Sequence, residues 1–251
     1  VARAIAHGAR LATERPPPPV DRGLRLPSYP WNRSDLHFPV TSERLDIFGD
    51  KPRHPLIGSR LAEGQPEWRS LLDARIVPYL ADHVVDGEIV VPGTALAEMM
   101  LVVARDLKAE GPIGIEDLDI HAPLVLPQDA MREISVRYTG IGGFVEIWSR
   151  PRLGADEWSL HARGRLLPSA GVIPPVPPPS GELRHHDSGE IYAHASASGL
   201  NYGPTFRLAL EADRDAATMN VRLGHPSPSG VGQFDRPQLL DPTSFDSALH
   251  P

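Results

Sequence analysis

The stretch "GEIVVPGTALAEMMLVVARDLKAEGP" (residues 87–112) decides which fold the rest of the chain has to build. Its first part is β-branched and ends in a Pro-Gly pair, which predicts a short strand followed by a tight turn. Apolar residues then recur at positions 96, 99, 100, 103 and 107, the spacing of one broad buried helix face. The sequence therefore predicts a long helix, with Thr94 as its N-cap, that ends near Gly111 and Pro112.

Short alternating runs follow this helix and are typical of antiparallel strands. They are "IGIEDLDIHAPLVL" (113–126), "REISVRYTG" (132–140), "GFVEIWSR" (143–150) and "EWSLHARGRLL" (157–167). The glycine-rich "GIGGF" (140–144) lies between two of them with no helix after it, which favours a hairpin turn over a phosphate-binding loop. The order is thus strand, long helix, then a meander of strands.

Proline clusters divide the chain. "RPPPPV" (15–20) and "LPSAGVIPPVPPPSGEL" (167–183) predict extended connectors, because proline fixes φ and removes a backbone donor. We therefore expect a leader over 1–50, a first unit over 51–167, a linker over 168–181 and a second unit over 182–251. The chain does not begin with methionine, which suggests a piece of a longer polypeptide.

The second unit repeats part of the first. A short helix is expected after residue 188, strands within 209–224, and the start of a helix in "PTSFDSALH" (242–250). Too little chain remains after that helix for a full copy of the first unit. We expect the second unit to be truncated at Pro251, because a helix that stops after its first turns leaves its apolar face unburied.

Composition narrows the class of partner. The 251 residues are 41% hydrophobic and carry a formal net charge of −7, which argues against a nucleic-acid or anionic-membrane surface and favours small molecules or proteins. No cysteine is present, so a disulfide framework, a thiolate zinc site and a cysteine nucleophile are excluded. No run is long enough to span a membrane, and the expected location is the cytoplasm.

Single residues leave several readings open. His83 is a structural histidine, a base or a metal ligand, and the metal reading is weakest because Asp82 and Asp86 have no second histidine at a ligand spacing. Asp246 and His250 lie one helical turn apart, which equally describes an ordinary amphipathic helix. Zinc-protease, P-loop and GxSxG signatures are absent. Four other histidines are expected to be solvated: His121, His161, His185 and His186.

Three ordered motifs stand out. His83, Gly87 and Pro92 match HxxxGxxxxP; Tyr202, Gly203, Pro204 and Phe206 match YGPxF; Asp246 and His250 match DxxxQ/H. Together these motifs resemble the dehydratase domain of modular or iterative type I polyketide synthases, which implies an α+β, double hotdog fold.

Two further stretches fit the same resemblance. "HPLIGSRL" (54–61) resembles the usual start of that domain, and "LPSYPWNR" (26–33) in the leader resembles the linker after an acyltransferase. One departure is Asp241–Pro242, where the family commonly has His-Pro.

The resemblance implies loss of water from a 3-hydroxyacyl thioester, giving a 2,3-enoyl thioester. His83 would be the base that removes the C2 proton, and Asp246 the acid that protonates the departing C3 hydroxyl. Free N–H groups near Gly93 and Thr94 are expected to face the thioester carbonyl. The residues expected to position substrate are Gly87, Pro92, Gly93, Tyr202, Gly203, Pro204 and His250.

The same resemblance sets the expected cofactors and partners. The domain itself binds no cofactor or metal, and its substrate is carried on the phosphopantetheine of acyl carrier protein. Expected partners are that carrier, the other synthase domains and a second copy in a homodimer. Two alternatives stay open: a non-catalytic scaffold that docks the carrier, and a hotdog that shifts a double bond or shapes the chain.

Overall fold

The structure of the chain is a computed structural model that describes residues 54–61, 64, 66–109, 111–154, 157–167, 175, 178–179, 182–225 and 238–249. All of them fall within one compact unit, Val40–Pro251. The predicted leader over 1–50 and most of the predicted linker over 168–181 lie outside the described residues, so those boundaries stay predictions. The described part combines antiparallel sheets with a few helices.

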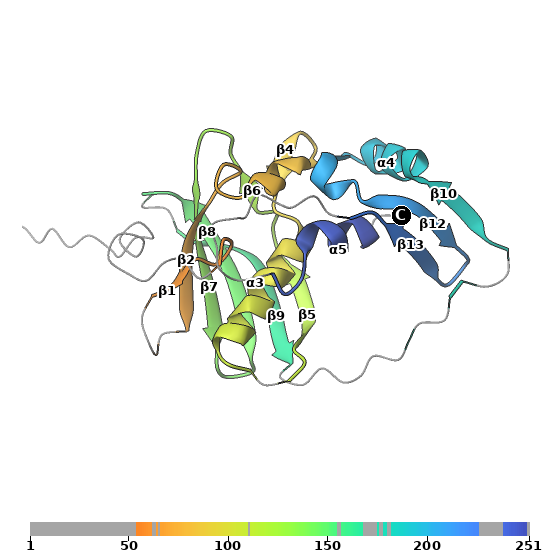
Figure 1. The fold of residues 1–251 in the computed structure, drawn as a ribbon. Helices are drawn as coiled ribbons and strands as arrows, with labels where there is room; N and C mark the ends of the chain where they lie inside the picture. The colour runs from red at the N-terminus through yellow and green to blue at the C-terminus, as the bar shows by residue number, and fades with distance from the viewer. Residues whose placement is uncertain are drawn as a thin grey trace, which may run out of the picture. The chain divides into compact units, whose positions relative to one another are not determined.

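The first half is an antiparallel sheet packed on one helix, α3 (Gly93–Asp106), as Figure 1 shows. Alternate residues of the central strands point inward and are buried, among them Ile134, Val136 and Ile147. They meet the buried face of α3 in one apolar cluster, as the helix periodicity predicted. In sheet order the strands are β1 (Ser59–Arg60), β2 (Glu67–Leu72), β7 (Arg132–Thr139), β8 (Phe144–Pro151), β9 (Ser159–Leu167) and β5 (Gly114–Ile120).

The ends of α3 differ from the prediction. Pro92 holds the N-cap position in extended conformation, and Thr94 lies inside the first turn with its hydroxyl directed at other groups, so the N-cap assignment to Thr94 was wrong. The helix stops at Asp106, before Gly111. Lys108 adopts a left-handed φ of 59°, and its N–H and that of Ala109 bond back to the last turn. This pair of bonds closes the helix without glycine.

A small sheet joins the two halves. Its order is β11 (Leu200–Tyr202), β3 (His83–Val85), β4 (Glu88–Val90) and β6 (Val125–Leu126). The β3–β4 hairpin turns through Asp86 and Gly87, whose φ values of 50° and 84° fit a two-residue turn of the Asp-Gly type. A Cβ on Gly87 would meet no atom within 4 Å, so it is the positive φ of the turn that favours glycine here.

The second half contains the elements expected from its sequence. The 3₁₀ turns η1 (Pro78–Asp82) and η2 (Pro204–Phe206) meet where the halves join, and α5 (Pro242–Leu249) contacts both α3 and β13 (Met219–Leu223). Figure 1 shows α5 next to the end at which α3 begins. The other elements are β10 (Arg184–Asp187), α4 (Ser188–Ala197) and β12 (Ala209–Arg214), with sheet order β10-β12-β13.

Asp82 fastens the two halves beside His83. Its backbone oxygen accepts the N–H of Gly203 at 2.7 Å, and its Oδ2 accepts the N–H and hydroxyl of Thr205 at 2.9 and 2.8 Å. The approach is so close that a Cβ on Gly203 would lie 2.2 Å from Asp82 Oδ1. Gly203 is therefore required by packing at this joint.

We predict that Gly203→Ala lowers the free energy of unfolding by about 1 to 3 kcal/mol, the usual cost of overpacking. The added methyl must displace the Asp82 carboxylate and its bonds to Thr205. Urea denaturation measures the change. The matched control is Gly140→Ala, whose Cβ would meet nothing within 4 Å; equal losses in the two variants would contradict the packing argument.

Candidate active site

His83 is oriented by the neighbouring strand. Its Nδ1 lies 2.7 Å from the carbonyl oxygen of Val90 on β4. A carbonyl oxygen only accepts, so Nδ1 carries a proton, and in the neutral imidazole the lone pair is on Nε2. Nε2 lies 3.8 Å from Oδ2 of Asp246, and both side chains are less than a tenth exposed. A hydrogen-bonded histidine thus directs its second ring nitrogen at a buried carboxyl group.

Asp246 is placed by α5 and by the start of α3. Asp241 caps α5 through its Oδ1, which accepts the N–H of Thr243 at 2.9 Å and of Ser244 at 3.3 Å. The departure from the family's His-Pro therefore supplies a helix cap. The hydroxyl of Thr94 lies 3.3 Å from Asp246 Oδ1 and 3.1 Å from the carbonyl oxygen of Pro242, which ties α5 to the first turn of α3.

Two aromatic rings enclose this pair. Tyr202 is the strand partner of His83 in the β11–β3 ladder, and the ring centroids are 5.5 Å apart. The Phe206 ring, fully buried, lies 5.3 Å from the imidazole. Burial, followed by the charge of Asp246 and a hydrogen bond to its side chain, raises the pKa of the Tyr202 hydroxyl. The hydroxyl therefore stays protonated at neutral pH and donates to Asp246.

A cavity of about 290 Å³ opens beside His83. Its wall is mostly apolar and is formed by the end of β4, the first turn of α3 and the loop 120–124. Gly93 contributes the helix N-terminus, where partial positive charge gathers. The lining includes His83, Pro92, Gly93, Leu96, His121 and Ala122.

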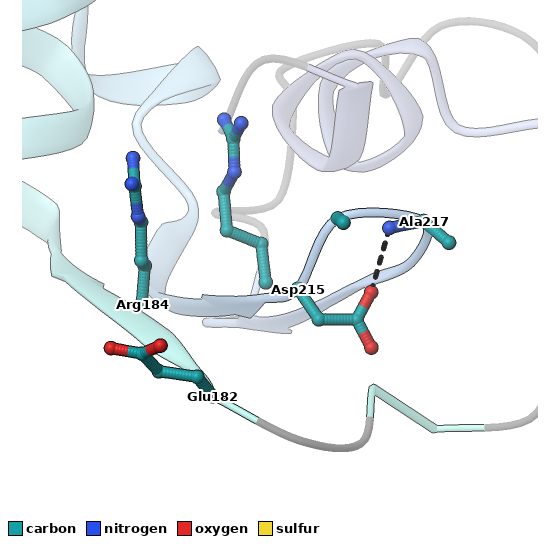
Figure 2. Close-up of a pocket in the computed structure, with 6 residues that line it drawn as sticks. Glu182, Arg184, Asp215 and Ala217 are labelled. Carbon is teal, nitrogen blue, oxygen red and sulfur yellow. Dashed lines mark hydrogen bonds between the residues drawn. The ribbon is translucent and has the colours of Figure 1, made fainter.

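A second cavity of about 650 Å³ lies at the end of the β10-β12-β13 sheet and shares no lining residue with the first. Figure 2 shows Arg184 and Glu182 pointing in different directions there. The Asp215 carboxylate accepts the N–H of Ala217 at 2.8 Å, and so it is occupied by its own turn. This cavity contains neither His83 nor Asp246.

His161 supports the loop that walls the first cavity. It is buried, so the expectation that it would be solvated was wrong; its ring is hydrogen-bonded between Ser149 on β8 and the loop at Ala122. Its Nε2 lies 2.8 Å from Ser149 Oγ, its Nδ1 lies 3.2 Å from the carbonyl oxygen of Ala122, and its own carbonyl accepts the N–H of His121. Burial lowers the pKa of His161 below its usual 6.5.

We predict a pH-dependent stability difference between the wild type and His161→Gln. Below about pH 6.5 the unfolded chain binds a proton at this histidine before the folded chain does, so wild-type stability falls relative to the variant. The difference levels off once the pH is below the folded pKa. Urea denaturation at several pH values measures it.

His185→Gln is the control of opposite sign. A hydrogen bond to Asp213 raises the pKa of this exposed histidine, so its contribution is present at low pH and is lost as the pH rises. The same pH trend in both variants would contradict the assignment for His161.

The structure brings some predicted site residues together and separates others. His83, Tyr202 and Asp246 meet directly, and Pro92 and Gly93 line the cavity. Gly87 and Pro204 are exposed and form no part of that lining, and Gly203 lies at the joint beside Asp82. Their positioning roles stay predictions. His250 lies outside the described residues.

Sequence reasoning missed several contributors. Thr94 was interpreted as a helix cap and Asp82 as a weak metal candidate, yet one contacts Asp246 and the other joins the halves. His121 was expected only to be solvated; it is exposed and also lines the cavity. The position of Thr94 two residues after Pro92 was a usable signal that this residue has a role at the start of the helix. Its partner Asp246 could not be found in the same way, because it lies 152 residues further along the chain.

Two general findings apply to the described part of the chain. Among the described residues, His, Asp and Glu form no group of three or more that could hold a metal ion. No helix in those residues has both the length and the hydropathy needed to cross a membrane.

Comparison with known proteins supplies a family. The family model described as the polyketide synthase dehydratase domain matches residues 54–150. The chain is 32% identical over its whole length to the spectinabilin polyketide synthase system protein NorB of Streptomyces orinoci, and 34% identical over 78% of its length to NorA of the same organism. It spans only 12% and 11% of these relatives.

Solved structures agree with this match. The dehydratase domain from the terminal module of the rifamycin polyketide synthase is 28% identical, with a TM-score of 0.62 over 79% of this chain and 74% of that one. A structure from work on dehydratase substrate selection in the borrelidin and fluvirucin synthases is 27% identical, with the same TM-score over 80% and 74%. The chain therefore belongs to the dehydratase domains of polyketide synthases and has their α+β, double hotdog fold.

Proposed function

We propose that the chain removes water from a 3-hydroxyacyl thioester carried on the phosphopantetheine of acyl carrier protein, and so forms a 2,3-enoyl thioester. The observation that carries this proposal is the facing pair of His83 Nε2 and Asp246 Oδ2, 3.8 Å apart and buried, with one residue from each half. Dehydration needs a base at one carbon and an acid at the hydroxyl of the adjacent carbon, and this pair offers both.

The proposed step assigns each proton. The lone pair of His83 Nε2 takes the C2 proton, while the protonated Asp246 carboxyl gives its proton to the C3 hydroxyl, which leaves as water. The C2 electron pair forms the double bond as the C3–O bond breaks. The Val90 carbonyl keeps the proton on Nδ1, and so keeps Nε2 available as the base.

Neighbouring groups support this division of roles. The Tyr202 hydroxyl and the Thr94 hydroxyl hold the Asp246 carboxyl, and the cavity beside His83 has a mostly apolar wall. The N-terminus of α3 at Gly93 stabilises negative charge on the thioester carbonyl as the C2 proton leaves. His250, which follows α5 directly in the sequence, is a further orienting group for the Asp246 carboxyl.

Partners and location belong to the same proposal. The matched relatives are proteins of polyketide synthase systems that are much longer than this chain, which supports other synthase domains as neighbours. Acyl carrier protein, a homodimer and a cytoplasmic location follow from the proposed reaction and family.

We predict that His83→Ala and Asp246→Asn each lower the rate of dehydration by at least about 100-fold, the lower end of what general acid–base groups contribute. A 3-hydroxyacyl pantetheine thioester is incubated with the protein, and mass spectrometry follows the loss of about 18 Da, the mass of water eliminated in this acid–base step. The matched controls are His185→Ala and Asp213→Asn, an exposed pair on β10 and β12.

The outcomes separate the alternatives. Thioester binding by the wild type without any mass change favours a scaffold, and a moved double bond without water loss favours an isomerase. Near-normal dehydration by either active-site variant removes that residue from the proposed mechanism.

A further inference from the structure

Glu98 is a buried carboxylate that the proposed chemistry does not use. It lies on α3 with none of its surface exposed, among side chains that are otherwise mostly apolar. A buried carboxylate is costly unless hydrogen bonds or a charged partner compensate for the lost hydration. The groups around Glu98 therefore indicate what the residue does.

Both oxygens of Glu98 bind the backbone just before α5. Oε1 accepts the N–H of Leu239 at 2.9 Å, and Oε2 accepts the N–H of Leu240 at 2.7 Å. These two consecutive N–H groups lie in the other half of the molecule. Charge-assisted bonds of this kind are stronger than neutral ones. Two of them fix the position of the bonded backbone as well as its distance from the carboxylate.

His54 completes the cluster from the start of the first half. Its Nε2 lies 3.3 Å from Glu98 Oε1, and both side chains are fully buried. The N–H of Leu56 donates to its Nδ1, so in the neutral imidazole the proton is on Nε2, which is close to the carboxylate but not aligned for a hydrogen bond. Glu98 is thus packed against His54 of one half while it binds backbone N–H groups of the other.

The contact between Glu98 and the backbone before α5 lies close to the helix that carries Asp246, and so it can affect the position of Asp246. Thr94 and Glu98 are four residues apart, so they lie on one face of α3. Thr94 contacts Pro242 and Asp246, and Glu98 binds the residues directly before the Asp241 cap. One face of α3 therefore grips the start of α5 at two points, one helical turn apart.

We infer that Glu98 is a positioning residue: its carboxylate clamps the Leu239–Leu240 backbone to α3 and thereby holds Asp246 opposite His83. This role rests on the proposed dehydration. A displacement of about 1 Å at a reacting group can reduce a rate by about 100-fold, so a loosened clamp lowers turnover more than substrate binding.

Glu98→Gln tests the clamp with almost no change in volume. The amide keeps one acceptor oxygen but turns an NH₂ group toward the second backbone N–H. We expect kcat to fall at least about tenfold with KM changed less than about twofold, since the reacting groups and not the binding walls are displaced. Amide hydrogen exchange in peptides that cover Leu239 and Leu240 should become faster.

The matched control is Glu133→Gln. Glu133 is also buried, on β7, but its partners are Arg69 and Arg150 on the outer face of the large sheet. This variant should lose stability with little change in kcat or in exchange at residues 239–240. If Glu98→Gln fails to fold, Glu98→Asp keeps the carboxylate but withdraws it by one carbon, and the same fall in kcat is expected.

Each result has one meaning. Unchanged exchange at Leu239 and Leu240 in a folded Glu98 variant overturns the clamp. Faster exchange with kcat equal to that of the Glu133 control overturns the positioning role. Absence of dehydration by the full wild-type chain overturns the proposed function itself, and with it the positioning role; normal exchange protection in the same sample would leave only the contact.

Discussion

The antiparallel pairing of β3 with β11 is the contact on which the site depends. It sets His83 opposite Tyr202 in register and brings the YGPxF turn against Asp82. Together with the bonds from Thr94 and Glu98 to the segment around the start of α5, this pairing holds the base and the acid in one body. Each half has its own apolar cluster, the first of which also includes Phe206 of the second half, and the joint adds short, tight polar contacts at Asp82. Polar contacts of this kind specify one arrangement, whereas apolar packing alone tolerates several.

The second constraint acts on α5, which has only eight residues and cannot hold its position by itself. Asp241 caps it, Thr94 meets its first turn, and the Ser247 hydroxyl donates to the carbonyl oxygen of Phe206. Its position is thus assembled from contacts with segments distant in sequence. The position of the Asp246 carboxyl is therefore fixed by those contacts and not by the intrinsic stability of the helix.

Local patterns were enough for most elements but not for the contacts between them. The periodicity after Gly93 predicted α3, and the glycine-rich "GIGGF" predicted the β7–β8 hairpin, because both signals are contained within a few residues. The early end of α3 was missed because Lys108 accepts a left-handed conformation that sequence statistics assign to glycine. Thr94 and His161 were misread because their partners, Asp246 and Ser149, are brought near only by the fold. His83 and Asp246 were assigned as base and acid from the family resemblance. No periodicity in the sequence links the two residues.

The narrow joint at Asp82 also limits how such domains can recombine. A crossover placed between Leu167 and Arg184 would take Asp82 and His83 from one parent and Gly203 and Thr205 from the other. The space beside Asp82 admits no Cβ at position 203, so the two parents must share this steric arrangement before their acid and base can meet. The site is therefore transferred intact only when the contacting residues of both halves are transferred together. Exchange of a single half carries only part of it.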